Sequence, residues 1–289
     1  SNNVDGLNNE SFDHNKYLRR NFWGYVKNIL NKKDTSLPSF NMTDCFHYFS
    51  KSLAKISPNK LFAIPSWIPK LSDPQVQFNL DPPTYQQITN IVRKMKSSGS
   101  PCPIDQLSII CFKRCPYLRT YLTDLIHEIW QSGIVPTEWK RACTILIHKK
   151  GNTNDPSNFR PITLESIPLK VFTSCLRNEI FSFLASNHFI EHTIQKGFTP
   201  NLSGTLEHTA QMADIINKAR IKQRSVVITL LDLKNAFGEI HHNLIQSVLD
   251  YHHIPDHIKI VIKSLYTDFQ TSIITSKFHT PFITVGRGV

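Results

Sequence analysis

The sequence predicts an α+β protein in which a helical N-terminal region precedes a body of helices and short strands. Apolar residues recur at helical spacing through much of the chain, beginning with residues 16–30 and 40–56. Short runs rich in apolar and β-branched residues, at 142–148 and 226–231, have the length and composition of strands instead. Because these runs alternate with helical patterns and no internal repeat occurs, we expect helices packed around a small sheet.

The composition favours an intracellular, nucleic-acid-binding protein. The 289 residues include 33 Lys and Arg against 22 Asp and Glu, a formal charge of +11 that is typical of proteins with a polyanionic partner. Solubility alone is the alternative reading of this charge. No apolar run reaches the roughly 18 residues of a membrane span, and the polar start is unlike a signal peptide. The six cysteines have no framework spacing, so we expect reduced thiols inside the cell.

The N-terminal part, residues 1–83, is expected to be a helical extension that ends in a linker. Its two helical patterns are followed by a proline-rich stretch, residues 61–83, which cannot form regular helix and reads as a linker or an extended wrap. We therefore place a boundary near residue 83, with the main domain over residues 84–289.

The main domain should open with helices. Asp81 and Thr84 are capping candidates for a first helix. The buried stripe of that helix consists of Ile88, Ile91, Val92 and Met95. Gly99 and two prolines then interrupt the chain, a second helix is expected to start at Asp105, and helical patterns continue to a C-cap at Gly133.

A hairpin with a basic tip is expected next. Residues 142–148 form its first strand, a turn-rich loop follows, and FRPIT resumes the extended chain. Lys149, Lys150 and Arg160 would then lie on one short element, where a guanidinium fork and two ammonium groups suit a triphosphate. The plainer interpretation is ordinary surface charge, which applies to the two lysines more than to Arg160, whose backbone is restricted by Pro161.

The remaining elements follow in order. Helices are expected over residues 167–184 and 205–224, then a buried strand that ends in Asp232. Two further helices, over 242–251 and 256–266, precede a second hairpin made by TSIITS and FITVG.

Asp232 is the most informative single residue, because an acid at the end of an apolar strand is costly unless something pairs with it. Mg²⁺ prefers one or two carboxylates together with phosphate oxygens and water, so a strand-end aspartate is half of such a site. A helix N-cap or a turn is the alternative role for an aspartate at this place.

Five segments in register resemble the fingers and palm of a reverse transcriptase of the non-long-terminal-repeat (LINE-type) retrotransposon class. They are WKRACTILIHKKG, NFRPITL, IQKGF, LLDLKNAFGEIHHNLI and the closing GRGV. KMKSSGSPCPIDQLSI, upstream of them, is similar to the segment that opens such domains. The resemblance runs from about residue 84 to the end, and it implies right-hand polymerase fingers and a partial palm.

The resemblance also implies residue roles. Asp232 would be the first catalytic metal ligand, joined by the Leu233 carbonyl, in a site for two Mg²⁺ ions. Phe237 would be the steric gate that excludes a 2′-hydroxyl, although Gly238 stands where the family usually has Asp. The residues implied to hold the nucleotide phosphates are Lys149, Lys150 and Arg160, and those implied to lie near the template are Gln195, Gly197 and Phe198.

The implied function is RNA-directed DNA polymerase, with an RNA template, a DNA primer and dNTP as partners, in the cytoplasm and nucleus. The family's Tyr-x-Asp-Asp hairpin, which carries the second carboxylate pair, does not occur before Val289. The chain is therefore expected to be truncated before that motif, to lack the thumb and to be inactive alone. The alternatives are a non-catalytic nucleic-acid-binding scaffold or an inactive remnant. An unrelated Mg²⁺ nucleotidyltransferase would need an Asp-x-Asp pair, which Asp232-Leu233-Lys234 does not supply. Template preference, priming, oligomeric state and the role of residues 1–80 stay open.

Overall fold

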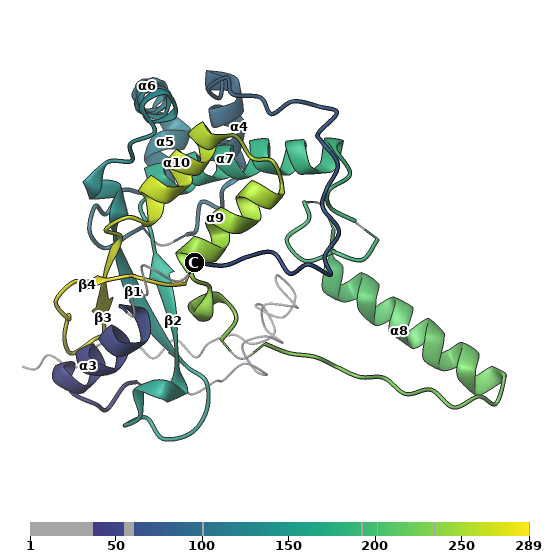
Figure 1. The fold of residues 1–289 in the computed structure, drawn as a ribbon. Helices are drawn as coiled ribbons and strands as arrows, with labels where there is room; N and C mark the ends of the chain where they lie inside the picture. The colour runs from purple at the N-terminus through teal and green to yellow at the C-terminus, as the bar shows by residue number, and fades with distance from the viewer. Residues whose placement is uncertain are drawn as a thin grey trace, which may run out of the picture.

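The computed structural model of the protein describes residues 37–54, 61–99, 101–191, 193–200, 202–233 and 235–288. These residues form a mixed α+β fold in which one four-stranded sheet packs beside a layer of helices (Figure 1). The helices are α3 (Met42–Leu53), α4 (Tyr85–Lys94), α5 (Ile109–Arg114), α6 (Pro116–Ser132), α7 (Ile167–Ser186), α8 (Gly204–Ile221), α9 (His242–Tyr251) and α10 (Asp256–Tyr266). Short 3₁₀ turns lie at Thr137–Lys140, Pro156–Asn158 and Phe237–Glu239. No helix in the described ranges is long and apolar enough to cross a membrane.

The sheet joins the two predicted hairpins. Strand β1 (Arg141–His148) pairs antiparallel with β2 (Phe159–Leu164), and β3 (Gln270–Ile274) pairs antiparallel with β4 (Ile283–Thr284). Both hairpins are therefore confirmed. A parallel pairing of β1 with β3 gives the strand order β2-β1-β3-β4. The sequence did not predict this pairing, which joins residues such as Ala142 and Thr271, 129 positions apart.

The larger core lies among α4, α5, α6, α7 and α10, which gather above the sheet in Figure 1. The predicted stripe of α4 is confirmed, since Ile88 and Val92 are fully buried while Ile91 and Met95 pack against the same core. Thr84 caps this helix in a capping box with Gln87. The C-cap of α6 at Gly133 is also confirmed.

A smaller core joins α3 to the sheet. Cys45 and Phe49 of α3, together with Phe40 just before it, bury against Phe159 of β2 and against Ile273 and Ile283 of the second hairpin. The rings of Phe40 and Phe159 meet edge to face with centroids 5.4 Å apart. The helix predicted near residue 45 is thus confirmed, and it covers one face of the sheet.

The proline-rich stretch is an extended wrap, as predicted. Between residues 61 and 83 the chain has no helix or strand and crosses the helical layer. The indole Nε1 of Trp130 donates to the Leu80 carbonyl at 2.9 Å, and the Tyr251 hydroxyl donates to the Pro69 carbonyl at 2.7 Å. These contacts fix the wrap at several points. The domain boundary near residue 83 stays a prediction.

Two helix boundaries differ from the prediction. The helix expected at Asp105 begins at Ile109 instead, because Ser108 caps it and Asp105 accepts a bond from Leu107 N within a turn. Helix α8 ends at Ile221 rather than at residue 224. The N-terminal helix predicted over residues 16–30 lies outside the described residues.

The buried strand predicted to end in Asp232 does not form. Residues 224–233 run as extended chain with exposed side chains, and Val227 and Leu231 are 91% and 93% exposed. A strand needs a partner for its N–H and C=O groups, and no described segment hydrogen-bonds to residues 225–233. Together with α8 this stretch forms an arm that projects from the body (Figure 1). The prediction failed because a strand-like sequence cannot itself supply the neighbouring strand.

Candidate functional site

The β1–β2 hairpin presents the three predicted cations to solvent. Lys149, Lys150 and Arg160 are all exposed, and no described carboxylate forms a salt bridge with them. The Lys149 ammonium donates to the Ser157 carbonyl across the loop at 3.4 Å. Arg160 lies opposite Ile147 in the strand register, on the sheet face away from Phe159 and its core. All three cations are therefore available to an anion.

Phe198 and Phe237, from two separate segments, meet at an exposed aromatic contact. Their rings lie edge to face with centroids 5.9 Å apart and an interplanar angle of 84°. Phe198 is 85% exposed and Phe237 is 57% exposed, so this pair is not part of a core. Such exposed aromatic faces are suited to contact with a base or sugar. The structure thus brings together one residue predicted near the template and the predicted gate.

The segment before Phe198 is held by its own hydrogen bonds. The Gln195 side-chain amide donates to the Gly197 carbonyl at 3.0 Å, and Thr199 Oγ1 donates to the Gln195 carbonyl at 2.9 Å. Gln195 and Gly197 therefore shape the turn that presents Phe198. The structure records no hydrogen bond, ion pair or ring contact between this turn and the hairpin cations within the described ranges.

Asp232 and Leu233 are exposed residues on the extended segment, five and four positions before Phe237. Their carboxylate and carbonyl oxygens are the ligands that Mg²⁺ prefers. The described residues contain no group of three or more His, Cys, Asp or Glu that could hold a metal ion. The donor chemistry fits one part of a magnesium site.

Three residues that the sequence did not single out surround Phe237. Glu239 forms an ion pair with Arg287 at 2.7 Å, and its other carboxylate oxygen accepts a bond from the Asn235 amide at 3.3 Å. The available signals were the acid beside Gly238 and the arginine within GRGV. Neither could be linked to Phe237 before the fold placed residues 239 and 287 in contact.

Three partly buried titratable groups, His242, Tyr266 and Glu165, lie next to one another near Gly288. The His242 ring packs on the Tyr266 ring with centroids 4.4 Å apart, and its Nε2 is 3.0 Å from the Gly288 carbonyl oxygen. Burial lowers the pKa of His242, although the Gly288 contact opposes that shift. Burial raises the pKa of Tyr266, and the negative charge of Glu165 raises it further. Burial also raises the pKa of Glu165, although the charge of Lys170 opposes that shift. Each of the three groups is thus shifted toward its neutral form.

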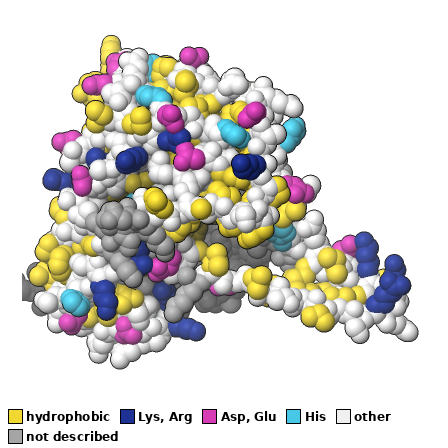
Figure 2. Space-filling model, in the orientation of Figure 1, with side chains coloured by type: hydrophobic (Ala, Val, Ile, Leu, Met, Phe, Trp, Pro, Cys, Tyr) yellow, Lys and Arg dark blue, Asp and Glu magenta, His cyan; other side chains and the backbone are white. Residues whose placement is uncertain are grey.

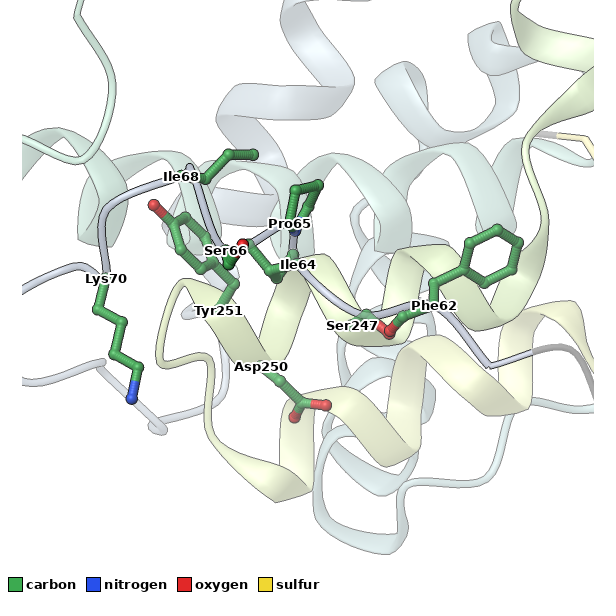
Figure 3. Close-up of a pocket in the computed structure, with 9 residues that line it drawn as sticks. All are labelled: Phe62, Ile64, Pro65, Ser66, Ile68, Lys70, Ser247, Asp250 and Tyr251. Atoms are coloured by element: carbon green, nitrogen blue, oxygen red, sulfur yellow. The ribbon is translucent and has the colours of Figure 1, made fainter.

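An open pocket lies apart from these residues, where the extended wrap crosses α9 (Figure 3). Three of its polar side chains are already engaged. Ser247 Oγ donates to the Phe62 carbonyl at 2.8 Å, Tyr251 binds the Pro69 carbonyl, and Asp250 forms an ion pair with Lys259. The pocket contains none of the predicted site residues and lies at the contact between the extended wrap and α9.

A second group of cations lies at the far end of the projecting arm (Figure 2). Lys218, Arg220, Lys222 and Arg224 follow one another at every second position, and all are exposed. Lys218 is paired with Asp214 at 2.7 Å, which leaves an excess of positive charge at this end.

The chain is similar to proteins of mobile elements. It is 29% identical over 168 residues to the "Retrovirus-related Pol polyprotein from type-1 retrotransposable element R2" of Nasonia vitripennis, which covers 58% of this chain and 16% of that protein. It is 24% identical over 172 residues to the "Probable RNA-directed DNA polymerase from transposon BS" of Drosophila melanogaster, or 58% of this chain and 18% of that protein. A third relative is the "Transposon TX1 uncharacterized 149 kDa protein" of Xenopus laevis, 23% identical over 237 residues, or 81% of this chain and 18% of that protein. No protein-family model matches the chain. The chain spans only about a fifth or less of the length of these curated relatives.

Proposed function

We propose that this homologue of non-LTR retrotransposon Pol proteins is part of an RNA-directed DNA polymerase. The proposed reaction transfers a nucleotide from dNTP to the 3′-hydroxyl of a DNA primer on an RNA template. The contact between Phe198 and Phe237 carries this proposal, because the two segments that resemble the template and sugar sites are distant in sequence and adjacent in space.

Each site residue takes a role that fits its position. Phe237 would contact the sugar of the incoming nucleotide, where a bulky ring leaves no room for a 2′-oxygen. Arg160, with Lys149 and Lys150, would hold the triphosphate through charge-assisted hydrogen bonds from the β1–β2 hairpin. Phe198 would stack beside the template, since an exposed aromatic ring binds any base through its face.

Asp232 and the Leu233 carbonyl would hold Mg²⁺, through the oxygen donors that this ion prefers. The ion would lower the pKa of the attacking hydroxyl and neutralise charge on the leaving pyrophosphate. The proposed location is the cytoplasm and nucleus, where an RNA template and a DNA primer would be found.

Primer extension by the full-length parent protein tests the proposal. Asp232→Asn removes the metal-binding charge but keeps the size of the side chain, so extension on an RNA template should fall by at least about 100-fold. Binding of the template and primer should stay within a few-fold of the wild type. Asp124→Asn is the matched control, because it removes an exposed acid from α6, away from both groups of cations, and should leave extension unchanged.

Two outcomes would contradict the proposal. Extension by Asp232→Asn close to that of the wild type would remove the catalytic role of this residue. Tight template binding without any extension by the wild-type parent protein would instead support a nucleic-acid-binding scaffold.

A further inference from the structure

The carboxylate of Glu239 fastens the short loop that carries Phe237. One oxygen pairs with Arg287 Nη1 at 2.7 Å, and the other accepts a bond from the side-chain amide of Asn235 at 3.3 Å. The Glu239 backbone N–H also donates to the Asn235 carbonyl at 3.1 Å. Phe237 lies between Asn235 and Glu239 in the chain, so these bonds join the backbone segments on its two sides.

Arg287 connects this loop to helix α3. While Nη1 binds Glu239, Nε donates to the Ser52 carbonyl at 2.8 Å. The neighbouring Gly286 N–H donates to the Leu53 carbonyl at 2.8 Å. The last carbonyls of a helix lack intrahelical donors and carry partial negative charge, so a guanidinium is well suited to this position. The Arg287 side chain is only 18% exposed, while its partner Glu239 is 52% exposed, so the ion pair is buried on the guanidinium side alone.

The backbone of residues 286–288 docks directly on the same loop. Arg287 forms an antiparallel bridge with His241, and the Gly288 N–H donates to the Ile240 carbonyl at 2.8 Å. Gly288 has a φ of +91°, and a Cβ there would lie 3.2 Å from the Phe237 carbonyl oxygen. A side chain at this position would therefore be strained and would press on the backbone of Phe237.

The absence of a side chain at Gly238 leaves room for the contact between Asn235 and Glu239. A Cβ at position 238 would lie 2.5 Å from the Asn235 amide nitrogen. The missing side chain leaves room for that amide, which donates to Glu239. Glu239 thus supplies the carboxylate that holds the loop.

From these contacts we infer that Arg287 is a positioning residue, which fixes the Phe237 loop against the end of α3 through Glu239. A role of Arg287 in nucleotide selection rests on the proposed function of Phe237. Its mechanical role, which is to hold the Phe237 loop in place, does not depend on that function. The inference also gives α3, which lies outside the segments that resemble a polymerase, a part in the site. By holding the backbone on both sides of Phe237, the contact keeps its ring from yielding to a larger sugar.

Hydrogen exchange on the chain of residues 1–289 tests the mechanical role. Arg287→Ala should speed exchange of the amides at residues 237–241 by roughly tenfold, because it removes both the ion pair with Glu239 and the bond to the Ser52 carbonyl. Arg287→Lys keeps the charge but cannot reach both partners, so it should restore part of the protection. Arg141→Ala is the matched control, since Arg141 is an exposed arginine on β1 and packs on Phe282 instead.

Selectivity of the full-length parent protein tests the functional role. Arg287→Ala should lower discrimination against ribonucleotides by roughly tenfold, mainly through a lower ribonucleotide KM, with a smaller change in kcat for dNTP. Glu239→Gln removes the same ion pair without deleting a large side chain, and it should lower discrimination in the same direction. This second variant keeps the test decisive if Arg287→Ala does not fold.

The outcomes separate the inference from the function on which it rests. Unchanged exchange at residues 237–241 in folded Arg287→Ala would overturn the mechanical role. Faster exchange with unchanged discrimination would overturn the role in selection. A wild-type parent protein that extends no primer would refute the proposed function, while the exchange experiment would still decide whether Arg287 holds the loop.

Discussion

The rings of Phe198 and Phe237 meet edge to face, and neither ring is buried. Edge-to-face aromatic pairs contribute about 0.5–1.5 kcal/mol beyond the area that they bury, so each ring helps to orient the other. The effects of substituting the two residues should therefore be coupled.

Substitution of Phe237 by Val should admit ribonucleotides in the full-length parent protein, because the smaller side chain leaves space for the 2′-oxygen. The discrimination ratio should fall mainly through the ribonucleotide KM. Phe198→Ala should cause a smaller fall in this ratio, since it removes a ring that supports Phe237 but leaves the Phe237 ring itself in place. Steady-state kinetics with both nucleotide types measure these effects, and fully additive changes in the double variant would contradict the coupling.

Arg160→Ala should raise the KM for all four deoxynucleotides alike, by roughly tenfold, because phosphate contacts carry no base information. Arg160→Lys should recover only part of the loss, since an ammonium lacks the bidentate fork. Arg141→Ala, an exposed arginine of the same sheet, serves as the control. An effect that depends on the base would show that Arg160 contacts something other than phosphate.

Nucleic-acid binding by residues 1–289 can be tested separately at the hairpin cations and at the cations of the projecting arm. Each phosphate neutralised contributes roughly 0.7–0.9 to the slope of log K against log salt. A Lys149→Ala, Lys150→Ala double variant should therefore reduce the slope by roughly 1.4–1.8 if both lysines contact the backbone. Arg220→Ala with Lys222→Ala makes the same test at the end of the arm. Binding that does not depend on salt would remove the argument from net charge.

Glu165→Gln should stabilise the protein at neutral pH. Burial raises the pKa of Glu165 in the folded state, so the folded protein binds its proton more tightly than the unfolded chain does. Stability from this group is present below the unfolded pKa and is lost as the pH rises through the folded pKa. The gain in Tm should thus be largest at pH 7–8 and should vanish near pH 4. Glu128→Gln, at an exposed site on α6, is the control, and a gain independent of pH would contradict the assignment.

Local patterns in the sequence were enough to predict most elements. The stripe of Ile88 and Val92, the C-cap at Gly133 and both hairpins were confirmed because each depends on neighbouring residues. Contacts between distant segments were not predictable in the same way. The β1–β3 pairing and the Arg287–Glu239 ion pair join residues far apart in the chain, and no periodicity records them.

The strand predicted before Asp232 was wrong for the same reason, because strand formation also depends on a distant segment. Its residues have the composition of a buried strand, yet a strand also requires a neighbour, which the described residues do not provide. The candidate site residues on the hairpin and at Phe198 and Phe237 were predicted from motifs, and their roles stay predictions. Their supports at Asn235 and Glu239 could not be predicted in this way, because side-chain partners follow from the fold.

The parallel pairing of β1 with β3 has a consequence for synthesis on the ribosome. Ala142 leaves the ribosome 129 positions before its partner Thr271, and at about 5–20 residues per second this interval lasts roughly 6 to 26 seconds. Throughout that time one edge of β1 has no native neighbour and can pair with a strand of another nascent chain. Translation speed across residues 142–271, rather than final stability alone, should therefore influence how much of the protein reaches its native form.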